Sequence, residues 1–167
     1  MIRALLCLLA TQAQGPGEYD VKAAFLYNFA LYVEWPAAAL EGRDAFTIGC
    51  LGPDVFAGAL EKTMKDRTAQ GRPVRVRRFA APEEVAPCHI LFVPVGERER
   101  IEKVAAALKG SGTLIVSESE GALRRGAVIN FYLEAQRVRF EVNPEAAGRE
   151  NLRLGAKILR LARIVKD

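Results

Sequence analysis

Residues 20–36 read DVKAAFLYNFALYVEWP, and this segment decides the fold. Phe25, Phe29 and Tyr32 recur at the spacing of one helix face, and a second apolar row lies beside them. Asp20 is a suitable N-cap, and the final proline biases the residue before it away from helical geometry. A helix that is apolar on almost every side is typical of a domain core. We therefore expect a helix that covers a sheet.

The rest of the chain alternates between strand-like and helix-like segments. The predicted strands are 46–51, 73–79, 89–95, 113–118, 127–134 and 137–142, and the predicted helices are 54–67, 97–109 and 144–165. Repeated strand–helix–strand units with buried strands indicate a mainly parallel sheet. The short turn at 135–136 indicates a hairpin. The expected fold class is α/β, a three-layer α/β/α sandwich with a mainly parallel central sheet and a C-terminal antiparallel hairpin.

The N-terminus is typical of a short secretory signal peptide, residues 1–13, in which Arg3 precedes an apolar stretch. We expect its cleavage, a periplasmic location, and one domain over residues 20–167. Without Arg3 the chain has 23 basic and 20 acidic residues. This excess is too small and too interspersed to indicate nucleic acid as a partner.

Two cysteines, Cys50 and Cys88, remain after removal of the signal peptide. In an oxidising compartment an isolated pair is most simply a disulfide, which for a loop of this length stabilises by roughly 4 kcal/mol in the chain-entropy model. The alternative is a metal site with His89, the single histidine. Such a site lacks the second ligand pair that structural zinc usually needs. We therefore expect a disulfide and no metal.

The sequence shows no catalytic or cofactor-binding motif. The glycines after the first strand lack the Gly-Lys-Ser/Thr of a phosphate loop, and Ser117 and Ser119 lack the context of a nucleophile elbow. In a parallel sheet a ligand would lie at the carboxyl ends of the strands, near 52–53, Gly96 and 117–119. The carboxylates there, such as Glu118, are typical of solvated surface charges. We expect neither an enzyme nor a cofactor.

Basic residues recur along one face of the last predicted helix: Arg149, Arg153, Lys157 and Arg160. One explanation is a solvated face whose late cations favour the helix dipole. The other is a site for an anion or an acidic partner, because guanidinium groups suit carboxylates and phosphates. An exposed aromatic side chain beside such cations would complete a binding site. The candidate contacts for a ligand or partner are therefore Trp35, Arg139, Arg153 and Arg160.

Three further segments carry a family resemblance: GAVINF at 126–131, RVRFEVN at 137–143 and KILRLARIV at 157–165. With residues 20–36 and the two cysteines, they make the chain resemble the YfiR family, small exported proteins of Gram-negative bacteria. The resemblance runs from about residue 20 to residue 165. It implies a non-enzymatic repressor that binds the periplasmic portion of an inner-membrane diguanylate cyclase and lowers cyclic-di-GMP synthesis and biofilm formation.

The same resemblance implies a homodimer and a stabilising disulfide, which the spacing of Cys50 and Cys88 fits. Some members carry a further cysteine pair, which this sequence lacks. A small anionic or aromatic ligand is another candidate partner. Two other function classes stay open: a periplasmic small-ligand-binding module that serves another membrane sensor such as a histidine kinase, and an exported enzyme.

Overall fold

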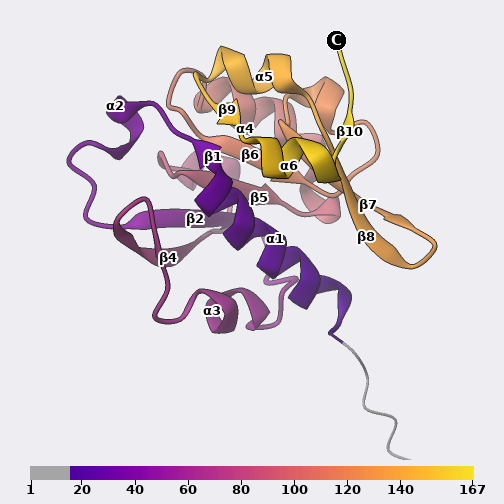
Figure 1. The fold of residues 1–167 in the computed structure, drawn as a ribbon, viewed down its shortest axis with the longest axis horizontal. Helices are drawn as coiled ribbons and strands as arrows, with labels where there is room; N and C mark the ends of the chain where they lie inside the picture. The colour runs from indigo at the N-terminus through magenta and orange to yellow at the C-terminus, as the bar shows by residue number, and fades with distance from the viewer. Residues whose placement is uncertain (1–15) are drawn as a thin grey trace, which may run out of the picture.

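A computed structural model describes residues 16–167 of the chain (Figure 1). The predicted signal peptide, residues 1–13, lies outside the described residues. The strands are β1 (Val33–Glu34), β2 (Phe46–Leu51), β3 (Thr68–Ala69), β4 (Arg72–Phe79), β5 (Ile90–Val93), β6 (Leu114–Ser117), β7 (Ile129–Glu134), β8 (Arg137–Val142), β9 (Arg153–Leu154) and β10 (Arg163–Ile164). The α-helices are α1 (Glu18–Tyr32), α2 (Ala37–Leu40), α3 (Ala59–Met64), α4 (Ile101–Ala107), α5 (Pro144–Arg149) and α6 (Ala156–Leu161). Within the described part of the chain, no helix is long and apolar enough to cross a membrane.

Eight strands form one sheet in the order β10-β8-β7-β6-β5-β2-β4-β3. Neighbouring strands are parallel except in two pairs, β7 with β8 and β3 with β4. The central strands β5 and β6 are continuous apolar runs because both of their faces are covered. The β7–β8 turn places Ala135 and Gln136 at positive φ, as a two-residue hairpin turn requires. The predicted α/β fold, with its mainly parallel sheet and antiparallel hairpin, is confirmed.

Helices cover both faces of this sheet, which gives three layers. On one face α1 crosses the strands and contacts α3 and α6 (Figure 1). Its buried Ala23, Leu26 and Phe29 pack with Ile48 of β2 and other inward residues. On the other face, buried residues of α4 pack with residues of β2, β5 and β6. The apolar faces of α1 and α4 thus sandwich the sheet.

The predicted helix at 20–36 corresponds to α1, with different ends. Gly17 is the N-cap, and Asp20 lies inside the first turn, where its carboxylate accepts a hydrogen bond from the Gly17 N–H at 2.9 Å. The helix ends at Tyr32, because the next two residues form β1 and pair antiparallel with β9. This pairing ends α1 before the predicted Trp-Pro boundary.

The prediction of one long helix at 144–165 is wrong. The segment contains α5, β9, α6 and β10. Asn151 has a φ of 57°, which ends helical geometry after α5. The Gly155 N–H then donates to the carbonyl oxygen of Tyr32 at 3.1 Å, which holds the segment against the end of α1. The basic residues of this segment therefore do not form a stripe on one helix.

The prediction of a helix at 54–67 is correct only in its second half, α3. Gly58, the N-cap, has a φ of 85° and separates α3 from the preceding turn. The Asp54 carboxylate accepts a hydrogen bond from the Phe56 N–H at 3.0 Å and stabilises that turn. Local side-chain bonding thus replaces the first helical turn.

We expect Gly155→Ala to destabilise the domain. A Cβ atom there would lie 2.4 Å from the carbonyl oxygen of Tyr32. The Gly155 backbone has a φ of −66° and a ψ of 157°, which alanine also adopts, so steric overlap alone causes the loss. The expected decrease in the free energy of unfolding is about 1–3 kcal/mol, measured by urea denaturation.

Gly148→Ala is the matched control. Gly148 lies in α5, and a Cβ atom there meets nothing within 4 Å. Alanine should raise the free energy of unfolding by about 0.5–1 kcal/mol, because it favours the helix. Equal stabilities of the two variants would contradict the close contact between Gly155 and α1.

Candidate functional site

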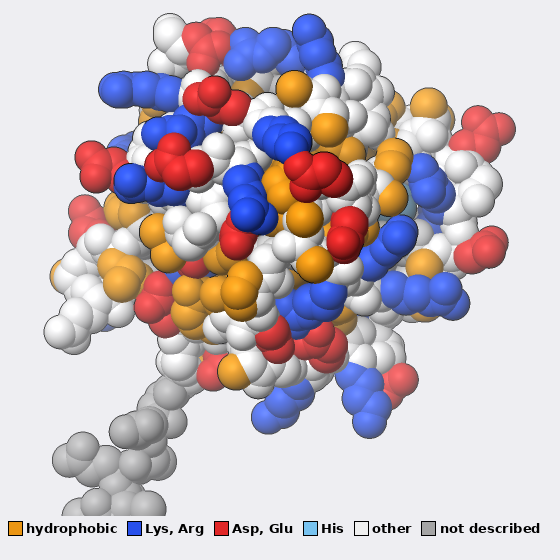
Figure 2. All heavy atoms as spheres, turned by 180° about the vertical axis from the view of Figure 1, so that it is seen from behind, with side chains coloured by type: hydrophobic (Ala, Val, Ile, Leu, Met, Phe, Trp, Pro, Cys, Tyr) orange, Lys and Arg blue, Asp and Glu red, His pale blue; other side chains and the backbone are white. Residues whose placement is uncertain are grey.

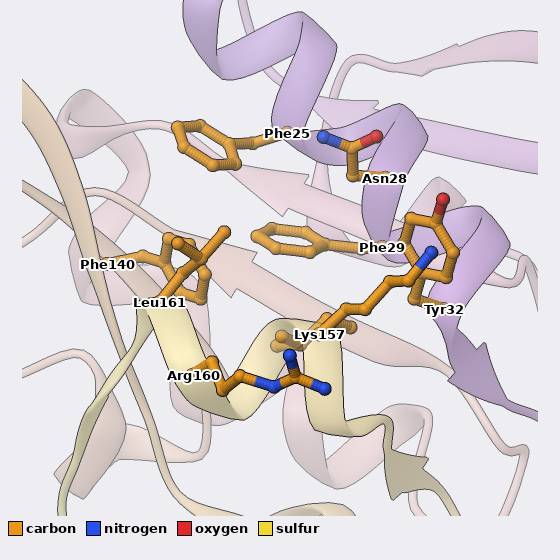
Figure 3. Close-up of a pocket in the computed structure, with 9 residues that line it drawn as sticks. Phe25, Asn28, Phe29, Tyr32, Phe140, Lys157, Arg160 and Leu161 are labelled. Carbon is orange, nitrogen blue, oxygen red and sulfur yellow. The ribbon is translucent and has the colours of Figure 1, made fainter.

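A pocket of about 400 Å³ lies between α1 and α6 (Figure 3). It is lined by Phe25, Asn28, Phe29 and Tyr32 of α1, Phe140 of β8, and Lys157, Ile158, Arg160 and Leu161 of α6. This volume falls within the range of small-molecule sites. The pocket therefore joins residues from the two ends of the described chain.

Aromatic rings form the floor of this pocket. The centroid of the Phe140 ring lies 5.2 Å from that of Phe25 and 5.1 Å from that of Phe29, and both contacts are edge-to-face. Phe29 is also 5.9 Å from Phe131 of β7. Phe29, Phe131 and Phe140 are at most 2% exposed and belong to the core. The floor is consequently held in place by the packing of the whole domain.

Two cations and two exposed apolar side chains form the rim. Tyr32 is 37% exposed and Leu161 is 62% exposed. The Lys157 ammonium lies 4.4 Å from the centroid of the Tyr32 ring, within cation–π distance. Among residues 16–167, no carboxylate lies within 4.0 Å of Lys157 or Arg160, whereas other arginines of this segment are paired. The pocket can therefore hold an apolar or aromatic group over the floor and an anion at the rim.

A second hollow of about 490 Å³ extends from Phe25 toward the β7–β8 hairpin. Its lining includes Val21, Leu133, Arg137 and Val138, and Leu133 is 54% exposed. Because Phe25 lines both hollows, they are neighbours along α1. We call the two lined hollows together the α1 groove.

The structure brings only Arg160, among the four predicted contact residues, to the pocket. Arg139 of β8 lies 3.7 Å from Glu134, which is diagonal to it across the hairpin. Arg153 of β9 is 80% exposed at its side chain and lies 3.6 Å from Glu34. The expected convergence of these arginines depended on one continuous last helix, which the chain does not form.

The expectation of an exposed Trp35 is wrong. The residue is 8% exposed, and its indole N–H donates to the carbonyl oxygen of His89 at 3.3 Å. Its ring packs edge-on against Phe46 at a centroid distance of 5.0 Å. Trp35 follows β1, which leads the chain inward after α1, so it acts as a core residue.

Apart from Arg160, the residues of α1 and α6 that line the groove were not predicted as contacts from the sequence. Phe25, Phe29 and Tyr32 were visible as one helix face, but this spacing is also that of an ordinary core helix. Their position beside Lys157 and Leu161 depends on the break at 151–155. No local sequence pattern reports this long-range contact.

The carboxyl ends of the central strands, where a parallel sheet most often binds a ligand, hold a buried ion pair. The Lys22 ammonium of α1 lies 2.6 Å from the Glu118 carboxylate after β6, and both side chains are 4% exposed. The prediction that Glu118 is a solvated charge is therefore wrong. Tyr19 donates to the same carboxylate at 3.0 Å, and burial, followed by the negative charge of Glu118, raises the pKa of Tyr19 to about 12. These contacts fix α1 on the sheet.

The serines at the same edge have structural partners. The Ser117 hydroxyl donates to the carbonyl oxygen of Val93 at 2.9 Å, which ties β6 to β5. The Ser119 N–H donates to the side-chain oxygen of Asn130 at 2.9 Å. Both serines are buried. These hydrogen bonds stabilise the carboxyl ends of the strands.

Cys50 and Cys88 are free and buried in the structure. Cys50 packs with the core on the α1 side of the sheet, and Cys88 packs with the core on the α4 side. A disulfide needs Cα atoms within about 7 Å and Cβ atoms that face each other. Bond formation would therefore require the segment of Cys88, before β5, to turn. The disulfide stays a prediction.

His89 is neutral and structural. Its Nδ1 accepts a hydrogen bond from the Thr47 N–H at 2.9 Å, so its Nε2–H donates to the Ala39 carbonyl oxygen at 3.0 Å. Burial lowers the pKa of His89 below its usual value. Both ring nitrogens are thus occupied. Among residues 16–167, no group of three or more His, Cys, Asp or Glu side chains could hold a metal ion.

Charges of both signs are interspersed on the face shown in Figure 2, which is the view from behind Figure 1. No extended field of one sign is visible there. A nucleic-acid surface requires a continuous basic patch, which this face does not offer.

A model of the YfiR/HmsC-like family matches residues 19–163. Among solved structures, a conserved domain protein from Vibrio cholerae O1 biovar El Tor is similar, with a TM-score of 0.60, 10% identity, and coverage of 90% of this chain and 60% of that chain. The ABC domain in complex with L-Trp from Streptococcus pneumoniae has a TM-score of 0.51, 12% identity, and coverage of 71% of this chain and 55% of that one. This chain thus spans little more than half of each. At these identities the likeness shows the fold alone.

We expect Arg160→Gln to weaken binding of an aromatic anion to the pocket. The probe is 8-anilinonaphthalene-1-sulfonate, which carries aromatic rings and one negative charge, and its fluorescence is titrated. Loss of one rim cation should weaken binding about two- to fivefold. Arg153→Gln is the matched control, because Arg153 lies outside the pocket. Equal affinity of the two variants would place the anion elsewhere.

Alkylation with iodoacetamide tests the predicted disulfide. If Cys50 and Cys88 are bridged, denatured protein from the periplasm takes up no label before reduction and two labels afterwards. Two labels without reductant would show free thiols, as in the structure. In reduced, folded protein we expect neither thiol to react at pH 8, since both thiols are buried and burial raises the pKa of each to about 12.

Proposed function

The chain belongs to the YfiR/HmsC-like family, and we propose on this premise that it is a non-enzymatic periplasmic regulator. Its partner in this proposal is the periplasmic portion of an inner-membrane diguanylate cyclase, which it represses, so that cyclic-di-GMP and biofilm formation fall. The observation that carries the proposal is the family match, which covers nearly all of the described residues. In this proposal the cyclase catalyses the synthesis of cyclic-di-GMP, and this chain contributes only a binding surface.

The α1 groove is the proposed contact surface. It combines exposed apolar side chains, Tyr32, Leu133 and Leu161, with a floor of core aromatic rings. Large apolar side chains exposed around a hollow are typical of protein–protein contact sites. Lys157 and Arg160, which have no carboxylate partner within residues 16–167, suit a partner that carries a carboxylate beside an apolar anchor.

Regulation follows from differential binding. A repressor that binds one conformation of the cyclase more tightly shifts the cyclase toward that conformation. A small anionic or aromatic ligand in the pocket would occupy the same floor and rim as the partner. Ligand and partner would then oppose each other, with a coupling free energy of about 1–3 kcal/mol in a typical regulated protein. The inducing signal is in this proposal the concentration of that ligand.

Export and self-association belong to the same proposal. The predicted signal peptide, residues 1–13, would deliver the chain to the compartment in which the sensor portion of the cyclase lies. We propose a homodimer on the basis of the family resemblance, and sedimentation at several protein concentrations measures it. A disulfide between Cys50 and Cys88 would form after export.

The second candidate function is a periplasmic small-ligand-binding module that serves another membrane sensor, such as a histidine kinase. The pocket favours it, because about 400 Å³ with an aromatic floor and two cations at the rim is suitable for a small aromatic anion. This candidate shares the pocket with the first and differs in the partner. Deletion of the gene separates them, since only a cyclase repressor would change cyclic-di-GMP.

We expect deletion of the gene in its host to raise cellular cyclic-di-GMP, and the wild-type gene to restore the parental level. Leu161→Asn should fail to restore it, because this substitution removes an exposed apolar contact of the α1 groove. The expected weakening of cyclase binding is about five- to thirtyfold. Cyclic-di-GMP is measured by mass spectrometry, and immunoblotting checks that the variants are equally abundant.

Val95→Asn is the matched control for this experiment. Val95 is 54% exposed, similar to Leu161, but lies outside the α1 groove. It should restore repression fully. Unchanged cyclic-di-GMP on deletion would contradict the repressor function, and repression by Leu161→Asn equal to that of Val95→Asn would contradict the groove as the contact surface.

A further inference from the structure

The outer edge of β4 is open over most of its length. On its inner side, β2 pairs with β4 from Val74 to Phe79. On its outer side, β3 pairs only with Arg72 and Pro73, and the Val74 N–H donates to the carbonyl oxygen of Arg67 at 2.9 Å. Between residues 16 and 167, no strand pairs with the outer edge of 75–79.

The direction of the backbone groups along this edge follows from two hydrogen bonds. The Val74 N–H points outward to Arg67, whereas the Phe79 carbonyl oxygen points inward and accepts from the Gly52 N–H at 2.8 Å. Peptide groups alternate between the two sides of a strand. The N–H and C=O groups of Val76 and Arg78 therefore point outward. They present two donors and two acceptors to an added strand.

Two unpaired arginines stand beside these groups. Arg75 and Arg77 are exposed, and among residues 16–167 no carboxylate lies within 4.0 Å of either guanidinium group. The Arg77 guanidinium rests 4.9 Å from the centroid of the Phe79 ring. Arg78, on the opposite face, is by contrast paired with Asp54 and Glu61. The open edge thus carries two positive charges on one face.

The half-buried Val74 and Val76 alternate with these arginines and pack against the core on the α1 side. A strand added to β4 would follow the same alternation, because side chains of neighbouring strands share faces. Acidic residues on one face of the added strand would then meet Arg75 and Arg77. Apolar residues on its other face would extend the cover over the two valines.

We propose that the β4 edge binds an extended acidic segment of a partner protein as an added strand. A second copy of this chain is disfavoured, because antiparallel pairing of two β4 strands centred on Val76 would set Arg75 directly opposite Arg77, and like charges opposite each other destabilise a strand pair. Acidic side chains at the positions opposite Arg75 and Arg77 in a partner strand would instead attract these arginines. Charge thus selects a partner of opposite sign.

The other edge of the sheet is a weaker template. There β10 pairs with Glu141 and Val142 of β8, and its Arg163 forms an ion pair with Glu141. Within the described residues no strand pairs with 137–140 on that side, but Arg139 there lies 3.7 Å from Glu134. Part of the charge on that edge is therefore neutralised, whereas both exposed arginines of β4 lack such a partner among residues 16–167. The proposal for β4 is independent of the α1 groove and of the cyclase, so it can fail or succeed separately.

The test uses the purified chain and a fluorescein-labelled hexapeptide of alternating valine and glutamate, with fluorescence anisotropy as the readout. The control peptide has glutamine in place of glutamate. We expect the glutamate peptide to bind more tightly than the glutamine peptide, and its binding to weaken with added salt. Amide exchange measured by NMR should slow at Val76 and Arg78 when the peptide binds.

Two sets of variants separate charge from backbone pairing. Arg75→Ala and Arg77→Ala should each weaken binding about two- to fivefold. Val76→Pro removes one outward N–H and keeps the pairing with β2, since proline is tolerated on an edge strand when its missing N–H faces solvent. It should weaken binding about fivefold relative to Val76→Ala, which controls for the lost side chain. Thermal unfolding checks that each variant is folded.

Three results would overturn the proposal. They are equal affinity for the glutamate and glutamine peptides, equal affinity of Val76→Pro and Val76→Ala, and absence of binding up to about 1 mM peptide. In each case the arginines would serve only to prevent pairing between copies of this edge.

Discussion

The packing of α1 across the sheet is the contact on which the rest of the structure depends. Phe25 and Phe29 interlock with Phe131 and Phe140 of the hairpin, and these rings make up much of the core on that face. The buried pair of Lys22 and Glu118 fixes the rotation of the helix. A buried ion pair tolerates little displacement, because loss of either partner leaves an uncompensated charge. Packing supplies the stability, and the ion pair selects one arrangement.

The second constraint is the return of the chain to the end of α1. Gly155 donates its N–H to Tyr32, and β9 pairs with β1 beside this contact. Consequently α6 lies along α1, and its Lys157 and Arg160 flank the aromatic floor. Segments that are far apart in sequence thus form one pocket, whose walls depend on these two backbone contacts at the end of α1.

The longer strands, β2 and β4 to β8, and the first helix were predictable because their patterns are local, whereas the two-residue strands β1, β3, β9 and β10 were not predicted. Buried apolar runs such as β5 and the positive-φ turn at 135–136 leave a signature within a few residues. The division of 144–165 was not predictable, because its apolar and basic residues also fit one amphipathic helix. The break depends on pairing with β1, which lies more than a hundred residues earlier. Arg160 was predicted correctly as a pocket residue because of its charge. Trp35 was wrongly predicted to be exposed, because its position after a helix does not reveal whether its side chain is buried.

The floor and the rim of the pocket face different evolutionary constraints. Phe29, Phe140 and Ile158 are core residues, so a change there alters folding as well as binding. Tyr32, Arg160 and Leu161 are exposed or nearly so, and surface changes usually alter stability little. Related proteins could therefore diverge in what they recognise by exchanging rim residues while the aromatic floor stays the same. In such a fold, binding specificity can change by substitution at the rim without a loss of stability.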